Sequence, residues 1–310
     1  MTGKWTAQEI PDQHGRTAVV TGANSGLGRI VARELARHGA KVIIASRDDA
    51  KGAEAAGAIT AACPSAAVEA AQLDLANLGS IRAFADRTRS GNDHIDLLIN
   101  NAGVMASPYS RTADGFELQF GTNHLGHFAL TGLLLPVLSE RSGTRVVTIS
   151  SNNHKAGKMR FDDLQGERRY SRWGAYAQSK LANLLFAFEL DRRLKAARRP
   201  LISVAAHPGY SATNLQLSPR PRYERLAMRL SNRLVAQPAE TGALPLLYAA
   251  TAPYLPGGSY VGPDGPAEMR GHPVLVRASA AAYDEKAARR LWDESEQLTG
   301  VAYDLGPPTT

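Results

Sequence analysis

Tyr176 and Lys180 are of the types, and at the spacing, that could carry out proton transfer. They lie four positions apart in a segment that we expect to be helical over 175–197, so both side chains fall on one face, one turn apart. A free tyrosine titrates near pH ~10, and a neighbouring ammonium group favours its phenolate and lowers its pKa. Such a tyrosine could serve as a general acid/base. An aromatic–lysine packing pair has the same spacing, so the pattern needs support from other residues.

Polar and small residues follow three expected strands of the chain. Ser150 and Ser151 close one strand, and the run Asn100–Gly103 closes another. Pro208 and Gly209 follow a third. The carboxyl ends of parallel strands lie at one edge of an open sheet, which is where such sheets bind ligands. A serine and a tyrosine hydroxyl at this edge can together hydrogen-bond an oxygen on which negative charge grows during a reaction.

A glycine-rich turn lies near the N-terminus. The segment from Thr21 to Gly28 reads TGANSGLG, and we expect a strand over 17–21 before it and a helix from 26 to about 38 after it. Glycines let the backbone turn tightly and approach a pyrophosphate, while the helix N-terminus offers amide donors. Glycine-rich loops are common, but this one lies inside a strand–helix–strand unit. We therefore predict a dinucleotide site.

Ser46 and Arg47 stand at the tip of the second expected strand, where the adenosine ribose of a dinucleotide would lie. An acidic residue here would favour NAD. A hydroxyl and a guanidinium instead suit a 2'-phosphate, with which arginine forms paired hydrogen bonds. Asp48 is expected to cap the next helix. The prediction is NADP(H) in preference to NAD(H); the alternative is a solvated arginine that follows a strand.

The chain alternates strand-like and helix-like segments without a long linker. The strands are continuous apolar runs, which is typical of parallel strands covered on both faces. We predict one α/β domain over 1–310, a Rossmann-type doubly wound parallel sheet of about seven strands with helices on both faces. The expected strands cover 17–21, 41–45, 68–73, 95–99, 145–149, 201–206 and 259–261, and the expected helices cover 26–38, 49–62, 80–89, 115–138, 175–197 and 284–298.

An insert near 210–237 follows the sixth strand, at the ligand-binding edge. Within it, 219–235 is predicted to be a basic amphipathic helix that acts as a lid, and its apolar side implies an apolar substrate. An ordinary surface helix packed on the core is the alternative, and a membrane-surface contact is a third reading. The arginine face comprises Arg222, Arg225, Arg229 and Arg233, and the apolar stripe comprises Tyr223, Leu226, Leu230 and Leu234.

These motifs, taken in order, resemble those of the short-chain dehydrogenase/reductase family. They are TGANSGLG, LDL at 73–75, NNAG, the serine pair, YAQSK at 176–180, and HPG at 207–209 with Thr213 beyond it. The run from Asn100 to Thr131, the 25-residue step from Ser151 to Tyr176, and SKLANLLF are similar to the retinol-dehydrogenase and WW-domain-oxidoreductase branch. The resemblance implies an NADP(H)-dependent interconversion of an alcohol and its ketone or aldehyde.

The resemblance also implies roles for individual residues. Tyr176 would be the general acid/base, and Lys180 would bind the nicotinamide ribose and lower the tyrosine pKa. Ser151, the second of the serine pair, would hold the substrate oxygen, and Asn123 would support a water relay. Asp74 and Leu75 would border the adenine ring, and Thr213 would anchor the carboxamide. The full set expected at the cofactor is Gly22, Asn24, Ser25, Gly26, Leu27, Gly28, Ser46, Arg47, Asp74, Leu75, Asn101, Ala102, Gly103, Tyr176, Lys180, Pro208, Gly209 and Thr213.

Composition argues against several other classes of protein. The net charge is +7, yet the arginines are scattered without the patterns of nucleic-acid binding. No apolar run is long enough to span a bilayer, and the N-terminus lacks a signal peptide, so a cytoplasmic location is expected. The lone Cys63 is interpreted as structural. Histidines 124, 127, 154 and 207 are interpreted as packing and turn residues, so no metal site is predicted.

Two other functions remain as alternatives. A sugar-nucleotide epimerase or dehydratase would have a different glycine spacing and a larger C-terminal substrate domain. A catalytically silent NADP(H)-sensing regulator would be expected to have lost Tyr176 or Lys180, and both are present. A small lipophilic carbonyl or alcohol is the expected substrate. Self-association as a homodimer or homotetramer is expected only by analogy with the family.

Overall fold

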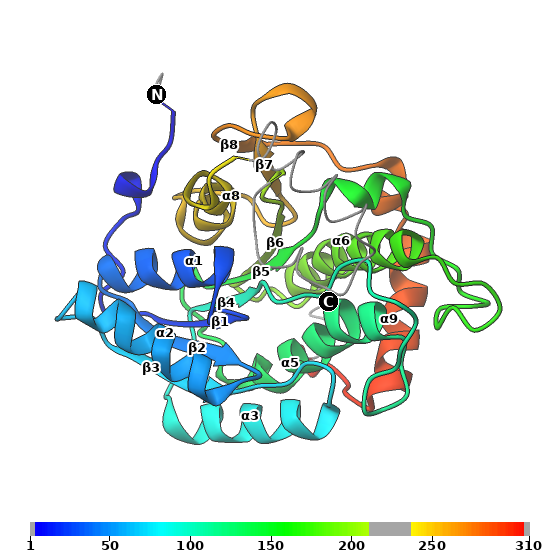
Figure 1. The fold of residues 1–310 in the computed structure, drawn as a ribbon, viewed down its shortest axis with the longest axis horizontal. Helices are drawn as coiled ribbons and strands as arrows, with labels where there is room; N and C mark the ends of the chain where they lie inside the picture. The colour runs from blue at the N-terminus through cyan, green and yellow to red at the C-terminus, as the bar shows by residue number, and fades with distance from the viewer. Residues whose placement is uncertain (1–3, 211–236, 307–310) are drawn as a thin grey trace.

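An eight-stranded sheet forms the centre of the molecule (Figure 1). The computed structural model describes residues 4–210 and 237–306. The strand order is β3-β2-β1-β4-β5-β6-β7-β8; β1 to β7 are parallel, and β8 runs antiparallel to β7. This confirms the predicted fold class, with eight strands in place of about seven. The strands are β1 (Thr17–Thr21), β2 (Lys41–Ser46), β3 (Val68–Gln72), β4 (Leu97–Asn100), β5 (Arg145–Ile149), β6 (Ile202–Ala206), β7 (Tyr260–Pro263) and β8 (Pro273–Leu275).

Helices cover both faces of the sheet, as Figure 1 shows. On one face α1 (Gly26–Arg37), α2 (Asp49–Ala62) and α8 (Ala239–Thr251) form a core with one side of the strands. On the other face the core includes α3 (Leu78–Gly91) and α5 (Gly126–Leu134). The long helix α6 (Arg172–Ala196) also lies on this second face, with α9 (Glu285–Thr299) packed against it. Apolar side chains on both sides of each central strand explain its unbroken apolar sequence.

Several helix ends follow directly from capping side chains. Asp48 accepts a hydrogen bond from the Lys51 amide and caps α2, as predicted. The side chain of Asp284 caps α9 in the same way. Leu291 and Trp292 are buried where α9 packs on the body of the protein, as their helical spacing indicated. Within 4–210 and 237–306, no helix is both long and apolar enough to cross a membrane.

The helix expected over 115–138 is not continuous. It consists of a short turn α4 (Leu118–Phe120), a π-helical turn η2 (Gly121–Leu125), α5 and a final 3-10 turn η3 (Leu135–Val137). Gly126 packs closely against the loop after β3, because a Cβ on it would lie 2.4 Å from the carbonyl oxygen of Leu75. Local π-helical turns are frequent at functional sites. Here the turn contains Asn123.

Among the α-helices and strands of residues 4–210 and 237–306, α8 and β8 were not predicted from the sequence. Helix α8 contains Pro245 and is apolar over most of its length, so it lacks the amphipathic period by which surface helices are recognised. Strand β8 is three residues long and lies at the edge of the sheet, beside β7. Both lie beyond the insert near 210–237.

Candidate active site

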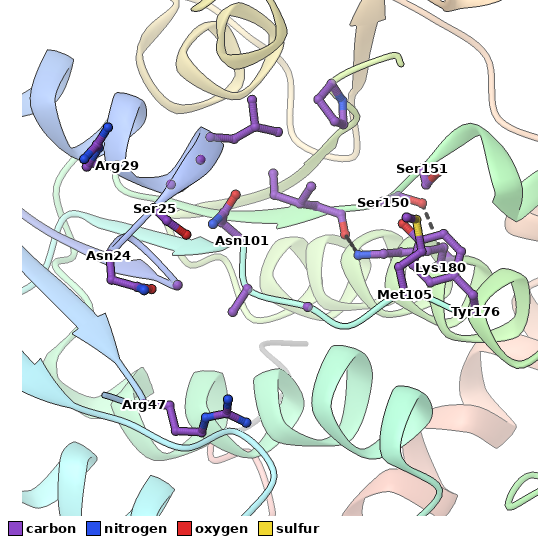
Figure 2. A pocket seen from close by; sticks show the side chains of 18 of the residues that line it. Asn24, Ser25, Arg29, Arg47, Asn101, Met105, Ser150, Ser151, Tyr176 and Lys180 are labelled. Atoms are coloured by element: carbon purple, nitrogen blue, oxygen red, sulfur yellow. Dashed lines mark hydrogen bonds between the residues drawn. The ribbon is translucent and has the colours of Figure 1, made fainter. Parts of the chain in front are cut away.

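One large cleft opens at the carboxyl ends of the central strands. Its volume is about 1080 Å³, and Figure 2 shows Arg47 toward one end and Ser151, Tyr176 and Lys180 toward the other. Residues from the loops after β1, β2, β4, β5 and β6 form its wall, together with residues of α1, α2 and α6. The lining residues are Gly22, Asn24, Ser25, Gly26, Leu27, Gly28, Arg29, Arg47, Lys51, Glu54, Ala55, Ala58, Asn101, Ala102, Gly103, Met105, Ile149, Ser150, Ser151, Asn153, Trp173, Tyr176, Lys180, Pro208, Gly209 and Tyr210.

The glycine-rich turn needs glycine for two different reasons. Gly22 and Gly26 have φ values of 67° and 57°, in the left-handed region that favours glycine. Gly28 allows close packing, because a Cβ there would lie 2.7 Å from the carbonyl oxygen of Gly22. Ser25 precedes α1 in an extended conformation and its side chain does not cap the helix. The first amides of α1 therefore remain donors beside the cleft, as an anionic pyrophosphate requires.

The end of the cleft beside α2 carries more positive than negative charge. Arg47 is exposed and lines the cleft together with Arg29 and Lys51, whereas Glu54 is the acidic residue in the same wall. Lys51 is also 3.3 Å from a carboxylate oxygen of Asp48. This arrangement could bind a phosphate group through a guanidinium and a nearby ammonium.

Ser46 lies differently from what its sequence position suggested. It is 3% exposed, and its hydroxyl donates to the carbonyl oxygen of Asp48 over 3.0 Å. Ser46 also lies close to Gly52 in α2, because a Cβ on Gly52 would be 3.3 Å from the Ser46 Cβ. Ser46 is therefore packed under the start of α2 and does not line the cleft, which leaves Arg47 as the residue of this pair that reaches it.

Tyr176 and Ser151 meet at the other end of the cleft. Tyr176 is almost fully buried in the first half of α6, and the hydroxyl of Ser151 is hydrogen-bonded to it. Burial raises the pKa of Tyr176 to about 12, and the hydrogen bond from Ser151 offsets this only in part. Burial of the phenolate and the Ser151 hydrogen bond govern this pKa, and no lowering by Lys180 is seen in the protein alone. The tyrosine is protonated at neutral pH.

The ammonium group of Lys180 lies at the carboxyl end of β5, close to Tyr176. Lys180 Nζ donates to the carbonyl oxygen of Ile149 over 3.0 Å and lies 5.8 Å from the centroid of the Tyr176 ring. Burial lowers the pKa of Lys180 to about 8, because a cation is poorly hydrated there. The ammonium group of Lys180 therefore loses its proton near pH 8, close to neutral pH.

The two consecutive serines have separate surroundings. Ser150 is buried, and its hydroxyl donates to the carbonyl oxygen of Lys180 over 2.8 Å. The Ser151 hydroxyl instead faces Tyr176 and accepts a hydrogen bond from the Asn153 amide over 3.3 Å. This geometry favours Ser151 over Ser150 as the residue that contacts a substrate oxygen.

The side chain of Asn123 connects the loop after β4 with helix α6. Its amide oxygen accepts from the Val104 amide over 2.8 Å, and its nitrogen donates to the Val104 carbonyl and to Ser179 Oγ, each over 2.9 Å. Its carbonyl oxygen lies 3.0 Å from Nδ1 of His127. Because its side chain is used in these contacts, a water relay at Asn123 would have to involve its carbonyl oxygen. Asn123 is not among the lining residues of the cleft.

The remaining predicted site residues fall into two groups. Asp74 and Leu75 follow β3 but do not line the cleft; Asp74 accepts a hydrogen bond from the Ala76 amide, and Leu75 is buried. Thr213 and the proposed lid over 219–235 lie outside the described residues. Apart from Ser46, the other predicted cofactor residues all line the cleft.

Sequence reasoning missed several residues of the wall. Trp173 lies one turn before Tyr176 on α6, is 45% exposed and makes an edge contact with the tyrosine ring at 6.3 Å. Met105 lines the same end of the cleft. At the other end, Arg29 follows the last glycine of the turn directly. The position of Trp173 three residues before Tyr176 was a usable signal, because residues three apart share a helix face.

The histidines that might have suggested a metal have partners within the protein. His124 Nε2 contacts Ser295 Oγ at 2.9 Å, and His127 Nε2 contacts Thr21 Oγ1 at 2.9 Å. His154 contacts the Ser151 carbonyl oxygen, and His207 lies beside Glu268. In the part of the chain that the structure describes, no three His, Cys, Asp or Glu side chains are grouped as metal ligands.

Known proteins resemble this chain over most of its length. Residues 16–223 match the family model described as short chain dehydrogenase. Mouse polyprenol dehydrogenase is 42% identical, with 97% of this chain and 89% of the relative covered. Human retinol dehydrogenase 14 is 41% identical, with 93% of this chain and 87% of the relative covered. The crystal structure of an uncharacterized Mycobacterium paratuberculosis protein, 49% identical, superposes with a TM-score of 0.82 over 97% of this chain and 99% of that chain.

Proposed function

Since this chain belongs to the short-chain dehydrogenase/reductase family, as its motifs indicated, we propose that it interconverts a lipophilic alcohol and its carbonyl compound with NADP(H). The observation that carries the proposal is the meeting of Ser151, Tyr176 and Lys180 at one end of a cleft whose wall includes the glycine turn. The enzyme class, an oxidoreductase that acts on CH–OH donors, follows from family membership.

The residues of the cleft fit a nicotinamide dinucleotide. The glycine turn and the amides at the start of α1 would bind the pyrophosphate, and Lys180 would contact the nicotinamide ribose. Arg47, supported by Lys51, would bind a 2'-phosphate. The cofactor, when bound, supplies or accepts the hydride. Arg47 and Lys51 support a preference for NADP(H), because neither would have a phosphate partner in NAD(H).

The chain's own groups account for the proton. In the direction of carbonyl reduction, the Tyr176 hydroxyl donates its proton to the substrate oxygen as that oxygen becomes an alcohol. The Ser151 hydroxyl donates a hydrogen bond to the same oxygen, whose negative charge grows during the reaction. A raised pKa keeps Tyr176 protonated and ready to donate at neutral pH. Lys180, while cationic, stabilises the phenolate that remains.

An apolar substrate is supported by the wall beside the reactive residues. Trp173 offers a half-exposed ring there, and Met105 adds an adaptable thioether side chain. The polyprenol and retinol dehydrogenases named among the relatives are in keeping with such a substrate. A cytoplasmic location and self-association as a homodimer or homotetramer remain further proposals; analytical ultracentrifugation tests the second.

A panel of carbonyl compounds tests the proposal directly. Short polar aldehydes, long-chain aldehydes and retinoids would each be offered with NADPH and, in parallel, with NADH. We expect turnover to be fastest with the apolar members and with NADPH. Absence of turnover with every member and both cofactors would reject the oxidoreductase assignment in favour of a silent NADP(H) sensor.

A further inference from the structure

Three loops meet behind the reactive end of the cleft. They are 151–156 after β5, 207–210 after β6, and 265–271 between β7 and β8. The first two contribute residues to the cleft wall, whereas 265–271 contributes none within the described chain. The backbones of the second and third loops are joined directly, since the Tyr210 amide donates to the Met269 carbonyl oxygen over 2.7 Å.

His207 connects the turn at Gly209 with the third loop. Its ring is fully buried, and its Nδ1 accepts a hydrogen bond from the Gly209 amide over 3.3 Å. A neutral ring that accepts at Nδ1 carries its proton on Nε2. Nε2 lies 3.1 Å from Oε2 of Glu268, at an angle that departs from a linear hydrogen bond. Burial lowers the pKa of His207, which favours this neutral form.

Glu268 also reaches the loop that contains Ser151. Its second oxygen accepts a hydrogen bond from Lys155 Nζ over 3.1 Å. Lys155 belongs to the 3-10 turn η4 (Asn152–Ala156), which begins directly after Ser151. Contacts with His207 and Lys155 lower the pKa of Glu268 to about 2, so the carboxylate is charged at neutral pH. A single carboxylate thus joins the loops that follow β5 and β6.

The backbone that carries this carboxylate is strained. Ala267 and Glu268 have φ values of 50° and 56°, a region that residues other than glycine rarely adopt. Asn152, the neighbour of Ser151, donates through Nδ2 to the carbonyl oxygens of both residues, over 3.1 and 3.3 Å. Consecutive strained residues persist only where the surrounding structure holds them, and such sites are often functional.

We infer that Glu268 is a positioning residue for the proposed reaction: it orients the His207 ring toward the Gly209 amide and holds the loop that presents Ser151. Its carboxylate takes no part in proton transfer to the substrate. Its effect is to keep Ser151 and the Gly209 turn in place against the reacting groups. The kinetic test of this inference rests on the proposed function. The structural test, by hydrogen exchange, is independent of that function.

Two glycine variants separate positioning from simple stability. Glu268→Gly removes the carboxylate and relieves backbone strain, because glycine accepts a positive φ. Ala267→Gly relieves similar strain at the adjacent position and leaves the carboxylate in place, so it is the matched control. Both changes relieve strain, so the melting temperatures of the two variants should differ only by what the carboxylate contacts contribute, and turnover is compared at a temperature at which both variants are folded. A difference in turnover between them then reports on the carboxylate.

Turnover and amide exchange are the two readouts. In Glu268→Gly we expect kcat to be lower by about tenfold or more than in Ala267→Gly, as for a misplaced catalytic group. The KM for the aldehyde and the Kd for NADPH should change by less than about threefold, since Arg47 and the glycine turn are not affected. Hydrogen exchange should become faster at the amides of 152–157 and 207–210 in Glu268→Gly alone.

Conservative changes complete the test. Glu268→Gln keeps an oxygen that faces His207 Nε2 and should restore most of the lost kcat. Lys155→Met, at an exposed side chain, removes the other contact without endangering the fold and should lower kcat by a smaller factor. Equal kcat in the two glycine variants would overturn the inference. Unchanged kcat in Lys155→Met, together with unchanged hydrogen exchange in Glu268→Gly, would also overturn it. If exchange responds as expected but even the wild-type protein reduces no carbonyl, the proposed function fails and the loop-holding role stands.

Discussion

Replacing Arg47 with alanine tests the cofactor preference. Arg47 is exposed at the tip of β2 and lines the cleft, and Lys51 of α2 is a second cation in the same wall. The variant should bind NADPH more weakly and NADH almost as before, because only NADPH carries the 2'-phosphate. The NADPH-to-NADH preference should therefore shrink or reverse.

The magnitude follows from the kind of contact. A hydrogen bond to a charged group contributes about 1.5–3 kcal/mol, which corresponds to about a ten- to 150-fold change in Kd. Arg47 is exposed, so water and salt screen its charge and the lower end applies. Lys51 remains in the variant and is already close to Asp48, so it should retain part of the preference. We expect a loss of about tenfold for NADPH.

Fluorescence titration of both cofactors, at low and at moderate ionic strength, measures these changes. Arg89→Ala is the matched control: it removes the same charge from an exposed side chain of α3, where Arg89 is 4.0 Å from Asp86. The wild-type preference for NADPH should decline with added salt more than that of Arg47→Ala. An equal loss for NADPH and NADH would show that Arg47 supports the fold and not the 2'-phosphate.

Three further predictions concern the rest of the cleft. Because the pKa of Lys180 is lowered to about 8, its charge is present below that pH and lost above it. NADPH affinity should therefore weaken as the pH rises from 7 to 9, and an equal pH dependence in Lys180→Met would contradict this. Trp173→Ala should raise the KM for long-chain aldehydes by about tenfold and leave the KM for short aldehydes nearly unchanged. Tyr254→Ala, at a fully exposed ring, is the control. The same rise in KM for both kinds of aldehyde would argue against a substrate contact. Gly28→Ala should lower the free energy of unfolding by about 1–3 kcal/mol and abolish NADPH binding. The reason is that the new Cβ would lie 2.7 Å from the Gly22 carbonyl oxygen. Retained NADPH binding in an isothermal titration would show that the turn can shift.

Most of the framework could be predicted from local sequence. Strands β1 and β5 have the predicted bounds, because an apolar run between polar residues leaves little choice of where the strand begins and ends. The glycine turn was equally clear, since the left-handed backbone at Gly22 requires a residue without Cβ. The capping of α2 by Asp48 follows from chemistry within four residues.

The features that were missed depend on packing between distant segments. The π-helical turn at 121–125 is followed directly by Gly126, which packs closely against Leu75 in a distant part of the sequence. The raised pKa of Tyr176 in the protein alone was not predicted, because the spacing of residues does not reveal the burial that causes it. Ser46 was placed in the cleft because strand ends point there, but it packs beneath α2.

The central claim is that Tyr176 donates and accepts the proton in a cleft that binds NADP(H). Tyr176→Phe removes one hydroxyl and keeps the ring that packs beside Trp173 and Lys180. The measurement is kcat on the best substrate of the carbonyl panel, with NADPH affinity determined on the same sample. We expect kcat to fall by about 10²- to 10⁴-fold and the NADPH Kd to stay nearly unchanged. A variant that keeps more than about a tenth of the wild-type kcat would contradict it.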